Sequence, residues 1–436
     1  MHPVPHLWPQ GTMVRGGTLW IGGCDTLALA AEFGTPLYVF DESTLRGAMA
    51  AYRDALAATG LETRVHYAGK ALLNTAIAQI VAAEGLGLDV VSGAELLLAR
   101  HAGVPMARVH LHGNAKSDAE LRRALEWGVG AIVADSLDEI ERLAALAPSA
   151  SAPQGVLLRI APAIEAHTHS HIATGGAGSK FGLPLGALDL AARRVLAAPR
   201  LRLLGLHAHI GSQLFELGEL RTTVEVLVRE AAGLHRRYGL TIEELSPGGG
   251  LGVAYTAEQL APDVVAYARE LAGALRASCA AHGLPLPRLT VEPGRSVVAR
   301  AGVALYRVVG RKLAPDGQVQ FLHVDGGMAD NIRPSLYGAR YTALLASRAA
   351  EPAGPPVDVA GRYCESGDVL LRDAHLPPAS PGDLLAVAAA GAYTLSMAST
   401  YNMVPRPAVV LVAGGHARLV QRRETEEDLL ARDLPL

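Results

Sequence analysis

The chain has 436 residues, 50% of them hydrophobic, and a formal net charge of -3. This length predicts two domains, or one large domain with an addition, and the apolar content suffices for a sizeable core. The near-neutral charge, without long runs of one sign, gives no reason to expect binding to nucleic acid or to an anionic membrane.

The cysteines and the N-terminus predict a cytoplasmic protein. Cys24, Cys279 and Cys364 are widely spaced, without metal-ligand spacing, and a sparse, odd count is typical of a reducing compartment. Residues 1–10 lack the basic and apolar regions of a secretory signal. No apolar run reaches the ~18 residues that a membrane span needs.

From about residue 35 to residue 300, strand-like and helix-like segments alternate. The first four strands recur at intervals of roughly 22 residues, which suits a strand–helix repeat. Repeated βα units without hairpin signals predict an α/β fold, a (β/α)8 TIM barrel, with a doubly wound parallel sheet as the alternative. The expected strands are 64–68, 87–91, 109–112, 131–134, 155–161, 203–209, 242–246 and 289–292.

Helix starts in this region carry capping signals. A Ser at the N-cap followed by Glu three residues later can satisfy free backbone N–H groups reciprocally. The expected capping boxes are Ser92 with Glu95, Ser117 with Glu120, and Ser136 with Glu139.

After residue 300 the sequence predicts a second, mostly β domain. Val- and Leu-rich segments punctuated by Gly and Pro replace the helical pattern. We expect strands at 303–313, 320–326, 357–363, 384–390 and 408–421, with the early strand 18–21 joining them. The predicted division is a barrel over 37–301 and a β domain formed by 1–36 and 302–436.

Lys70 is the first candidate for chemistry. Only four lysines occur in the chain, and this one closes the apolar strand Arg64-Val-His-Tyr-Ala-Gly-Lys70. The C-terminal ends of barrel strands are where such folds place their active sites. Apolar neighbours would desolvate the amine partly and free it for imine formation. The alternative is a surface lysine whose stem packs on apolar groups.

Two later segments predict anion binding. Ser246-Pro-Gly-Gly-Gly-Leu-Gly252 lets backbone N–H groups approach a phosphate, although it could be a plain tight turn. In Glu292-Pro-Gly-Arg295 the carboxylate can hold a ring nitrogen protonated, and Arg295 can pair with a phosphate or carboxylate, unless the two form a local ion pair. A reactive amine, a glycine cradle and a Glu/Arg pair are what pyridoxal phosphate needs.

His207-Ala-His209-Ile-Gly-Ser212 ends the sixth expected strand, with both imidazoles on one face. A ring could stack on one histidine, with Ser212 touching a phosphate. The spacing also suits zinc, so a zinc hydrolase is an alternative, but no matching set is expected at the other strand ends. In Cys364-Glu365-Ser-Gly-Asp368 the thiol could donate a proton or could be a small buried hydrophobe.

Taken together, these motifs resemble the diaminopimelate decarboxylase branch of the pyridoxal-phosphate decarboxylases over nearly the whole chain. The matching segments are Tyr67-Ala-Gly-Lys70, Asp89-Val-Val-Ser-Gly-Ala-Glu95, His112-Gly-Asn-Ala-Lys116, Ala166-His-Thr-His169, Ser179-Lys-Phe-Gly182, Gly205-Leu-His-Ala-His-Ile-Gly-Ser-Gln213, Gly248-Gly-Gly250, Glu292-Pro-Gly-Arg295, Asp325-Gly-Gly-Met328, Ile332-Arg-Pro334, Tyr337-Gly338, Cys364-Glu-Ser-Gly-Asp368, Gly391-Ala-Tyr393 and Arg406-Pro407. The chain departs from the family pattern in Ala71-Leu72 and in Gly326-Gly327-Met328-Ala329, which bear on fine substrate choice.

The resemblance implies a barrel with a β domain, a pyridoxal phosphate cofactor and decarboxylation of meso-diaminopimelate to L-lysine. Lys70 would bind the cofactor covalently, and Cys364 would donate a proton from the neighbouring subunit of a homodimer. The implied cofactor-binding residues are His209, Ser212, Gly248, Gly249, Gly250, Glu292, Gly294, Arg295 and Tyr393. The implied substrate-binding residues are Arg295, Arg333, Tyr337, Glu365 and Tyr393.

Other functions stay open from the sequence. A related decarboxylase could act on ornithine, lysine or arginine, whose lack of a second amino-acid head would leave Arg333 and Glu365 less to bind. A racemase would return the proton without losing CO2, and a non-catalytic cofactor carrier would not need the β domain.

Overall fold

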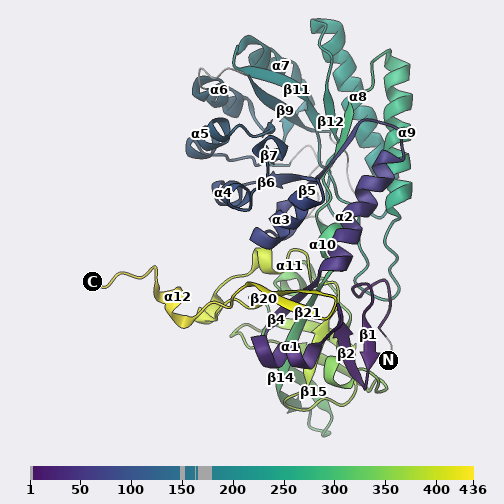
Figure 1. Cartoon of the computed structure of the whole chain (residues 1–436), viewed down its shortest axis with the longest axis vertical. Coiled ribbons are helices and arrows are strands. Elements are labelled where there is room, and N and C mark those ends of the chain that lie inside the picture. The colour runs from purple at the N-terminus through teal and green to yellow at the C-terminus, as the bar shows by residue number, and fades with distance from the viewer. Residues whose placement is uncertain (1–2, 148–152, 163, 165–178) are drawn as a thin grey trace. The chain divides into compact units, whose positions relative to one another are not determined.

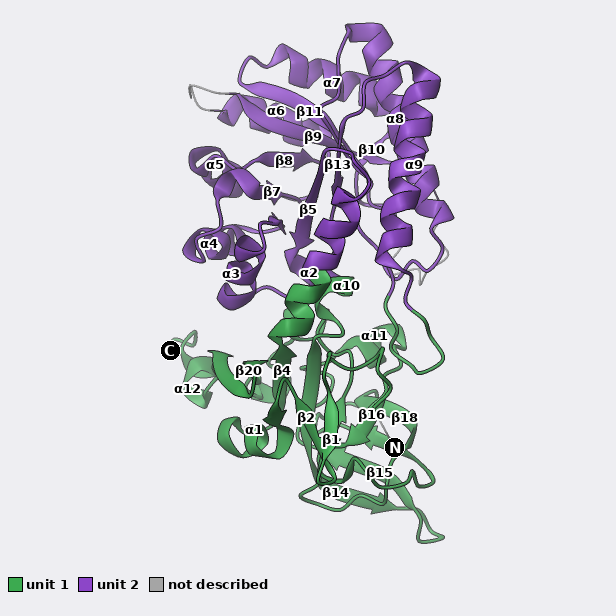
Figure 2. Cartoon of the chain, turned by 45° about the vertical axis from the view of Figure 1, so that its right-hand side comes forward, with its two compact units in different colours: residues 1–48, 253–260, 295–436 green, residues 49–252, 261–294 purple. Residues whose placement is uncertain are grey.

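The structure is a computed structural model that describes residues 3–147, 153–162, 164 and 179–436 (Figure 1). The chain divides into two compact units (Figure 2). Unit 1 comprises residues 1–48, 253–260 and 295–436, and unit 2 comprises residues 49–252 and 261–294. No helix in the described part of the chain is long and apolar enough to span a bilayer.

Unit 2 contains a closed barrel, which confirms the predicted fold class. Within the described residues, all its strands are parallel, in the order β9-β11-β12-β13-β5-β6-β7-β8, and β8 pairs with β9 to close the ring. The short strand β10 (Leu183–Pro184) adds to β9. The barrel strands are β5 (Thr63–Ala68), β6 (Gly87–Val90), β7 (Val109–Leu111), β8 (Ala131–Ala134), β9 (Gln154–Ala161), β11 (Leu201–His207), β12 (Glu244–Ser246) and β13 (Arg288–Val291).

Helices follow the barrel strands and lie outside them (Figure 1). They bury one face, as α5 does with Leu121 and Ala124 while Arg122 stays exposed. These helices are α3 (Thr75–Ala83), α4 (Gly93–His101), α5 (Asp118–Trp127), α6 (Leu137–Leu146), α7 (Leu188–Ala197), α8 (Gly218–Tyr238) and α9 (Val264–His282), with 3-10 turns at Gly69–Ala71, Met106–Arg108 and Leu185–Ala187. Helix α2 (Glu42–Ala57) precedes β5, and its residues 42–48 belong to unit 1.

The predicted capping boxes are only partly right. Each serine accepts the backbone N–H of the glutamate three residues on, as predicted. Only the Glu120 carboxylate accepts the backbone N–H of its own N-cap residue, Ser117. Glu95 and Glu139 instead accept the N–H of the residue before the N-cap, Val91 and Asp135.

Unit 1 is mostly β, as predicted. A small antiparallel sheet holds β1 (Met13–Arg15), β2 (Thr18–Ile21) and β3 (Cys24–Asp25). The larger sheet runs β18-β17-β15-β14-β4-β20-β21, while β19 pairs with β14 off this path and β16 pairs with β19. Its strands are β4 (Leu37–Asp41), β14 (Gly302–Leu313), β15 (Val319–Val324), β16 (Ala343–Leu345), β17 (Pro356–Ala360), β18 (Val369–His375), β19 (Leu384–Val387), β20 (Ala408–Ala413) and β21 (His416–Gln421).

Short helices complete unit 1. They are α1 (Thr26–Phe33), α10 (Arg295–Val298), α11 (Arg333–Tyr337) and α12 (Glu426–Leu430), with 3-10 turns at Ala346–Arg348, Leu395–Met397 and Tyr401–Met403. The predicted single strand 408–421 is wrong, because Gly414 and Gly415, both at positive φ, turn it into the hairpin β20–β21.

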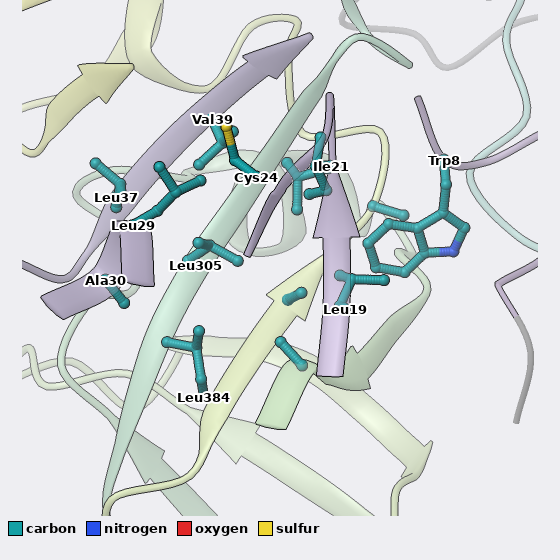
Figure 3. Close-up of a cluster of buried hydrophobic side chains, with 14 of the residues drawn as sticks. Trp8, Leu19, Ile21, Cys24, Leu29, Ala30, Leu37, Val39, Leu305 and Leu384 are labelled. Atoms are coloured by element: carbon teal, nitrogen blue, oxygen red, sulfur yellow. The ribbon is translucent and has the colours of Figure 1, made fainter. Parts of the chain in front are cut away.

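Strand β4 organises the core of unit 1, although the predicted barrel range 37–301 includes it. It pairs with β14 on one side and with β20 on the other. Leu37 and Val39 point into a buried apolar cluster with Leu305 of β14 and Leu384 of β19 (Figure 3). Residues 37–48 therefore belong to unit 1, in which Leu37 and Val39 are buried.

Candidate active site

Lys70 lies in the 3-10 turn that directly follows β5, at the C-terminal end of the barrel strands. Its neighbours Tyr67, Ala68 and Ala71 are buried, but the Lys70 side chain is exposed, so the expected desolvation of this amine is wrong for the chain as described. The turn packs tightly because the Ala68 N–H donates to the carbonyl of Pro293 at 3.0 Å. A Cβ at Gly294 would lie 3.1 Å from the Ala71 Cβ.

Glu292 follows β13 and is buried inside the barrel. One carboxylate oxygen lies 3.0 Å from Nε2 of His207, and the other accepts a 2.7 Å hydrogen bond from the Ser246 hydroxyl. Burial alone would raise the pKa of Glu292, but His207, His112 and these hydrogen bonds outweigh it and hold the pKa well below its usual range. The structure therefore keeps an ionised carboxylate in the barrel interior.

Further buried titratable groups continue from Glu292 across the barrel. The rings of His207 and His112 pack edge to face with centroids 5.2 Å apart. His112 Nε2 lies 3.4 Å from a carboxylate oxygen of Asp89, and that oxygen lies 3.1 Å from Nδ1 of His66. These residues come from β5, β6, β7 and β11 or the loops that follow them, so closure of the barrel brings them together.

This arrangement corrects one sequence-based expectation. His112, His207 and Glu292 place ligand atoms within 4.8 Å of one another, as do His66, Asp89 and His110. The expectation that no set at other strand ends matches the histidines of β11 is therefore wrong. His209 belongs to neither group, so the described residues do not support a metal site built on the His207/His209 pair.

The glycine loop after β12 lies against two neighbouring strand ends. A Cβ at Gly249 would lie 2.1 Å from the carbonyl oxygen of Glu292, and one at Gly248 would lie 2.7 Å from Nδ1 of His209. Gly248 and Gly250 have φ angles of 80° and 110°. Side chains are thus excluded by both space and backbone conformation, and the loop can offer bare backbone to a ligand.

His209 and Ser212 lie in the segment after β11, beside this loop. The Gly249 N–H donates to Nδ1 of His209 at 3.4 Å, and the loops are tied by the Leu214 N–H, which donates to the Gly250 carbonyl at 2.9 Å. Burial, followed by the positive charges of Lys70 and Arg159, lowers the pKa of His209 well below its ordinary value. Its imidazole is therefore a neutral, flat, half-buried surface, and Ser212 is half-buried in the same segment.

The predicted residues Arg295, Arg333 and Tyr393 cluster in unit 1. Arg295 Nη1 donates to the Tyr255 hydroxyl at 2.8 Å, and its guanidinium carbon lies 4.6 Å from the centroid of the Tyr393 ring. Arg333 donates to the Tyr341 hydroxyl and lies 4.6 Å over the Tyr255 ring. Both arginines are buried, and Arg333 begins α11, which Tyr337 ends.

Sequence reasoning missed Tyr255 and Tyr341. Tyr255 lies only a few residues beyond the glycine loop, yet it belongs to unit 1. No motif surrounds either tyrosine, and only the fold of unit 1 shows their contacts with the two arginines. His112 and Asp89 belong to matched motifs, but nothing local in the sequence indicates that His112 approaches Glu292 or that Asp89 lies beside His112 and His66.

Cys364 and Glu365 lie side by side in the exposed turn between β17 and β18. Asp368 holds this turn, because its carboxylate accepts the N–H groups of Tyr363 and Met328 at 2.8 and 2.6 Å. The Cys364 N–H donates to the side-chain oxygen of Asn402 at 3.1 Å. Cys24 and Cys279 are buried, so Cys364 is the exposed thiol of the chain.

One predicted motif is fixed to the barrel and another lies outside the described residues. Ser179-Lys-Phe-Gly182 is held where the Gly182 N–H donates to Asp135, and the Phe181 ring lies 4.5 Å from the guanidinium carbon of Arg159. Ala166-His-Thr-His169 is not among the described residues.

Comparison with known proteins identifies the family. The family model for "Pyridoxal-dependent decarboxylase, pyridoxal binding domain" matches residues 42–299. The diaminopimelate decarboxylase of Actinosynnema pretiosum subsp. auranticum is 47% identical over 431 residues, which cover 98% of this chain and 95% of that protein. The corresponding enzyme of Bacillus subtilis is 44% identical over 421 residues, covering 96% of each chain.

Solved structures agree with this match. The crystal structure of diaminopimelate decarboxylase from M. jannaschii in co-complex with L-lysine superimposes with a TM-score of 0.92 at 33% identity, covering 99% of each chain. The resemblance seen in the motifs is confirmed, and the chain belongs to the diaminopimelate decarboxylase family of pyridoxal-dependent decarboxylases.

Proposed function

We propose that this chain uses pyridoxal phosphate to decarboxylate meso-diaminopimelate to L-lysine and CO2. The observation that carries the proposal is the ionised Glu292, held between His207 and Ser246 inside a barrel that presents the Lys70 amine at its C-terminal end. The donor set fits the cofactor: an amine for its aldehyde, a carboxylate for its ring nitrogen, and glycines whose Cβ atoms would clash.

Residues of the barrel, together with Arg295 and Tyr393 of unit 1, would hold the cofactor as follows. Lys70 would bind its aldehyde carbon covalently, His209 would stack on its ring, and Glu292 would keep a proton on the ring nitrogen. The phosphate-binding groups would be Ser212, Gly248, Gly249, Gly250, Gly294, Arg295 and Tyr393. When bound, pyridoxal phosphate supplies an electron sink for the electron pair that remains as CO2 leaves.

The substrate's distal amino-acid head would be bound by unit 1. Arg295, Arg333, Tyr337 and Tyr393 would hold its carboxylate, and Glu365 would hold its ammonium group. The buried Arg333 supports this role, because its hydrogen bond goes to a phenol, which leaves its positive charge available to an anion. Ornithine, lysine and arginine have no distal carboxylate for these arginines.

We further propose that a homodimer is the active form, with the barrel of unit 2 binding the cofactor and unit 1 supplying further site residues and the dimer interface. The exposed thiol of Cys364 would deliver a proton to the α carbon of the neighbouring subunit's substrate. We also propose that the enzyme works in the cytoplasm, where these thiols stay reduced.

Reductive trapping tests the cofactor assignment. Borohydride treatment of the purified protein should add a pyridoxyl group to Lys70, detectable by peptide mass, and Lys70→Ala should lose both the adduct and the near-visible absorbance. An unchanged absorbance band in Lys70→Ala contradicts the assignment. In a substrate panel, CO2 release should be fastest from meso-diaminopimelate; faster release from ornithine, lysine or arginine, or racemisation without CO2, would favour an alternative.

Subunit mixing tests the dimer. Lys70→Ala and Cys364→Ala should each be nearly inactive, because each lacks one required group. If sites are shared between subunits, random reassociation of the two variants should restore about a quarter of wild-type activity, since half of the symmetric dimers are hybrids with one intact site. No recovery, with hybrid dimers shown by native mass spectrometry, would place both groups in one chain's site.

A further inference from the structure

The two buried arginines of unit 1 share one support, Tyr255. Its hydroxyl accepts the 2.8 Å hydrogen bond from Arg295, and its ring face lies 4.6 Å from the guanidinium carbon of Arg333. Each arginine is completed by a second tyrosine: Tyr393 lies under Arg295, and the Tyr341 hydroxyl accepts from Arg333. Each guanidinium thus contacts at least one phenol oxygen and at least one ring face, and Arg333 also lies 5.5 Å from the centroid of the Tyr341 ring.

Tyr255 is itself held firmly. Its ring packs edge to face on Tyr341, with centroids 5.2 Å apart and planes at 78°. Its N–H donates to the side-chain oxygen of Gln259 at 2.8 Å, and its carbonyl accepts the Thr342 hydroxyl at 3.0 Å. The side chain is buried, so both contacts with the arginines are made from a fixed position.

A phenol is suited to hold two cations without cancelling them. A carboxylate in the same place would neutralise one guanidinium, whereas a neutral phenol accepts a hydrogen bond and leaves the charge for a ligand. Burial raises the pKa of Tyr255, but Arg295 and Arg333 outweigh burial and lower it, which reflects the positive field around this hydroxyl. The buried Nε of Arg333 also has no hydrogen-bond partner among the described residues.

We infer that Tyr255 is a positioning residue that sets the spacing of Arg295 and Arg333 and thereby determines specificity for substrates with a distal carboxylate. This inference rests on the proposed function, because that function assigns the two arginines to the carboxylate. Tyr255 acts through the arginines. Its loss should therefore weaken binding of the carboxylate while leaving the covalent chemistry at Lys70 in place.

Two ligands that differ only by this carboxylate provide the test. L-lysine retains the distal head of diaminopimelate, and cadaverine is the same diamine chain without the carboxylate. In the holoenzyme, Tyr255→Phe should raise the dissociation constant of L-lysine about 10-fold, because a charge-assisted hydrogen bond is lost. The dissociation constant of cadaverine should change less than about 2-fold. The KM for diaminopimelate should rise by a similar factor, with kcat nearly kept.

Three further variants separate positioning from general damage. Tyr255→Leu removes both the hydroxyl and the ring face, so its effect on L-lysine should exceed that of Tyr255→Phe. Tyr341→Phe should weaken the binding of L-lysine through its effect on Arg333 alone. Tyr306→Phe is the matched control, since it removes a buried phenol of the same unit that hydrogen-bonds Asp330 and neither arginine; its ligand constants should match those of the wild type.

A second readout does not depend on ligands or turnover. Carbon-13 NMR of labelled tyrosine rings should show one tyrosine that titrates below its ordinary range and disappears in Tyr255→Phe. Burial raises the pKa of Tyr341 to about 12, although the positive charge of Arg333 opposes this effect, so Tyr341 should titrate at a higher pH than Tyr255.

The outcomes separate the two claims. If the wild-type enzyme binds L-lysine no better than cadaverine, the assignment of a distal-carboxylate site fails, and the inference fails with it. If the wild type prefers L-lysine and Tyr255→Phe keeps the full preference, the inference alone is overturned. Equal weakening of both ligands would show a merely structural role and would also overturn it.

Discussion

At the scale of single residues, the site depends on polar groups whose charge is set by their burial and partners. Glu292 is the clearest case, because it is buried in the barrel yet is held ionised by polar partners. His207 is held neutral: burial lowers its pKa, although Glu292 opposes this effect. A neutral imidazole whose Nε2–H faces the carboxylate donates a hydrogen bond without supplying a competing positive charge.

Replacement of His207 should therefore weaken cofactor binding. We expect His207→Phe to raise the pKa of Glu292, since one of its two hydrogen bonds is lost while burial remains. A protonated Glu292 no longer stabilises a charged ring nitrogen, so the dissociation constant of pyridoxal phosphate, measured by fluorescence titration of the apo-protein, should rise about 10-fold.

The conservative variant His207→Asn offers a donor in the same region and should recover part of this affinity. Ser246→Ala removes the other hydrogen bond, at 2.7 Å, and should act in the same direction. If His207→Phe binds the cofactor as tightly as the wild type at neutral pH, Glu292 does not need the imidazole.

Sequence motifs predicted which residues carry the chemistry better than they predicted the burial and contacts of those residues. Lys70, Glu292 and the glycine loop stand at strand ends, where the sequence placed them. The expected desolvation of Lys70 failed because burial depends on what covers a turn, which flanking apolar residues do not specify. Tyr255 was not predicted because its role depends on contacts with Arg295 and Arg333, which lie 40 and 78 positions later in the chain.

At the scale of elements, the barrel strands were predictable because each is a short apolar run next to helix-forming segments, several of which begin with a capping residue. The predicted barrel range wrongly includes strand β4, because a local apolar run does not specify its partners, and β14 and β20 lie more than 250 residues away. The hairpin β20–β21 was read as one strand although Gly414-Gly415 marks a turn.

One buried ion pair joins successive βα units of the barrel. Lys116, just before α5, donates 2.7 Å hydrogen bonds to the carbonyls of Gly113 and Val133 and to Glu139 in α6. Burial lowers the pKa of Lys116 and raises that of Glu139 by more than the pair restores. The pair thus fixes the geometry of α5, β8 and α6 but adds little net stability.

Replacing one partner of this ion pair should lower the free energy of unfolding more than replacing both partners. Lys116→Met leaves a buried carboxylate, and Glu139→Gln leaves a buried ammonium group, so each should destabilise unit 2 by about 3–5 kcal/mol. The double variant carries neither charge and should cost clearly less than the sum of the two. Urea unfolding of all four proteins completes the cycle. Additive effects would mean that the two groups act independently.

At the scale of the whole molecule, the stability of unit 1 should depend on pH through one buried carboxyl group. Asp330 accepts hydrogen bonds from the hydroxyls of Tyr38 and Tyr306 and from the N–H of Gly327. Burial, which these hydrogen bonds oppose only partly, raises its pKa to about 6. The folded state therefore binds this proton more tightly than the unfolded chain does.

The sign of the effect follows from this difference. A carboxyl group whose folded pKa is raised stabilises the fold most below its unfolded pKa, and this contribution declines as pH rises from about 4 to about 6. The decline should reach about 3 kcal/mol, from a difference of about two pKa units. Thermal unfolding followed by circular dichroism between pH 4 and pH 8 measures it.

Variants separate the contribution of Asp330 from those of other titrating groups. Glu292, for example, has a lowered pKa, so the stability that it contributes is lost only at lower pH. Asp330→Asn cannot titrate, so the stability gap between wild type and variant should narrow as pH rises to about 6 and then stay constant. Tyr306→Phe removes a hydrogen bond that favours the ionised carboxylate, so its decline should extend to higher pH. A gap that stays constant from pH 4 to pH 7 would show that Asp330 ionises no differently in the folded protein than in the unfolded chain.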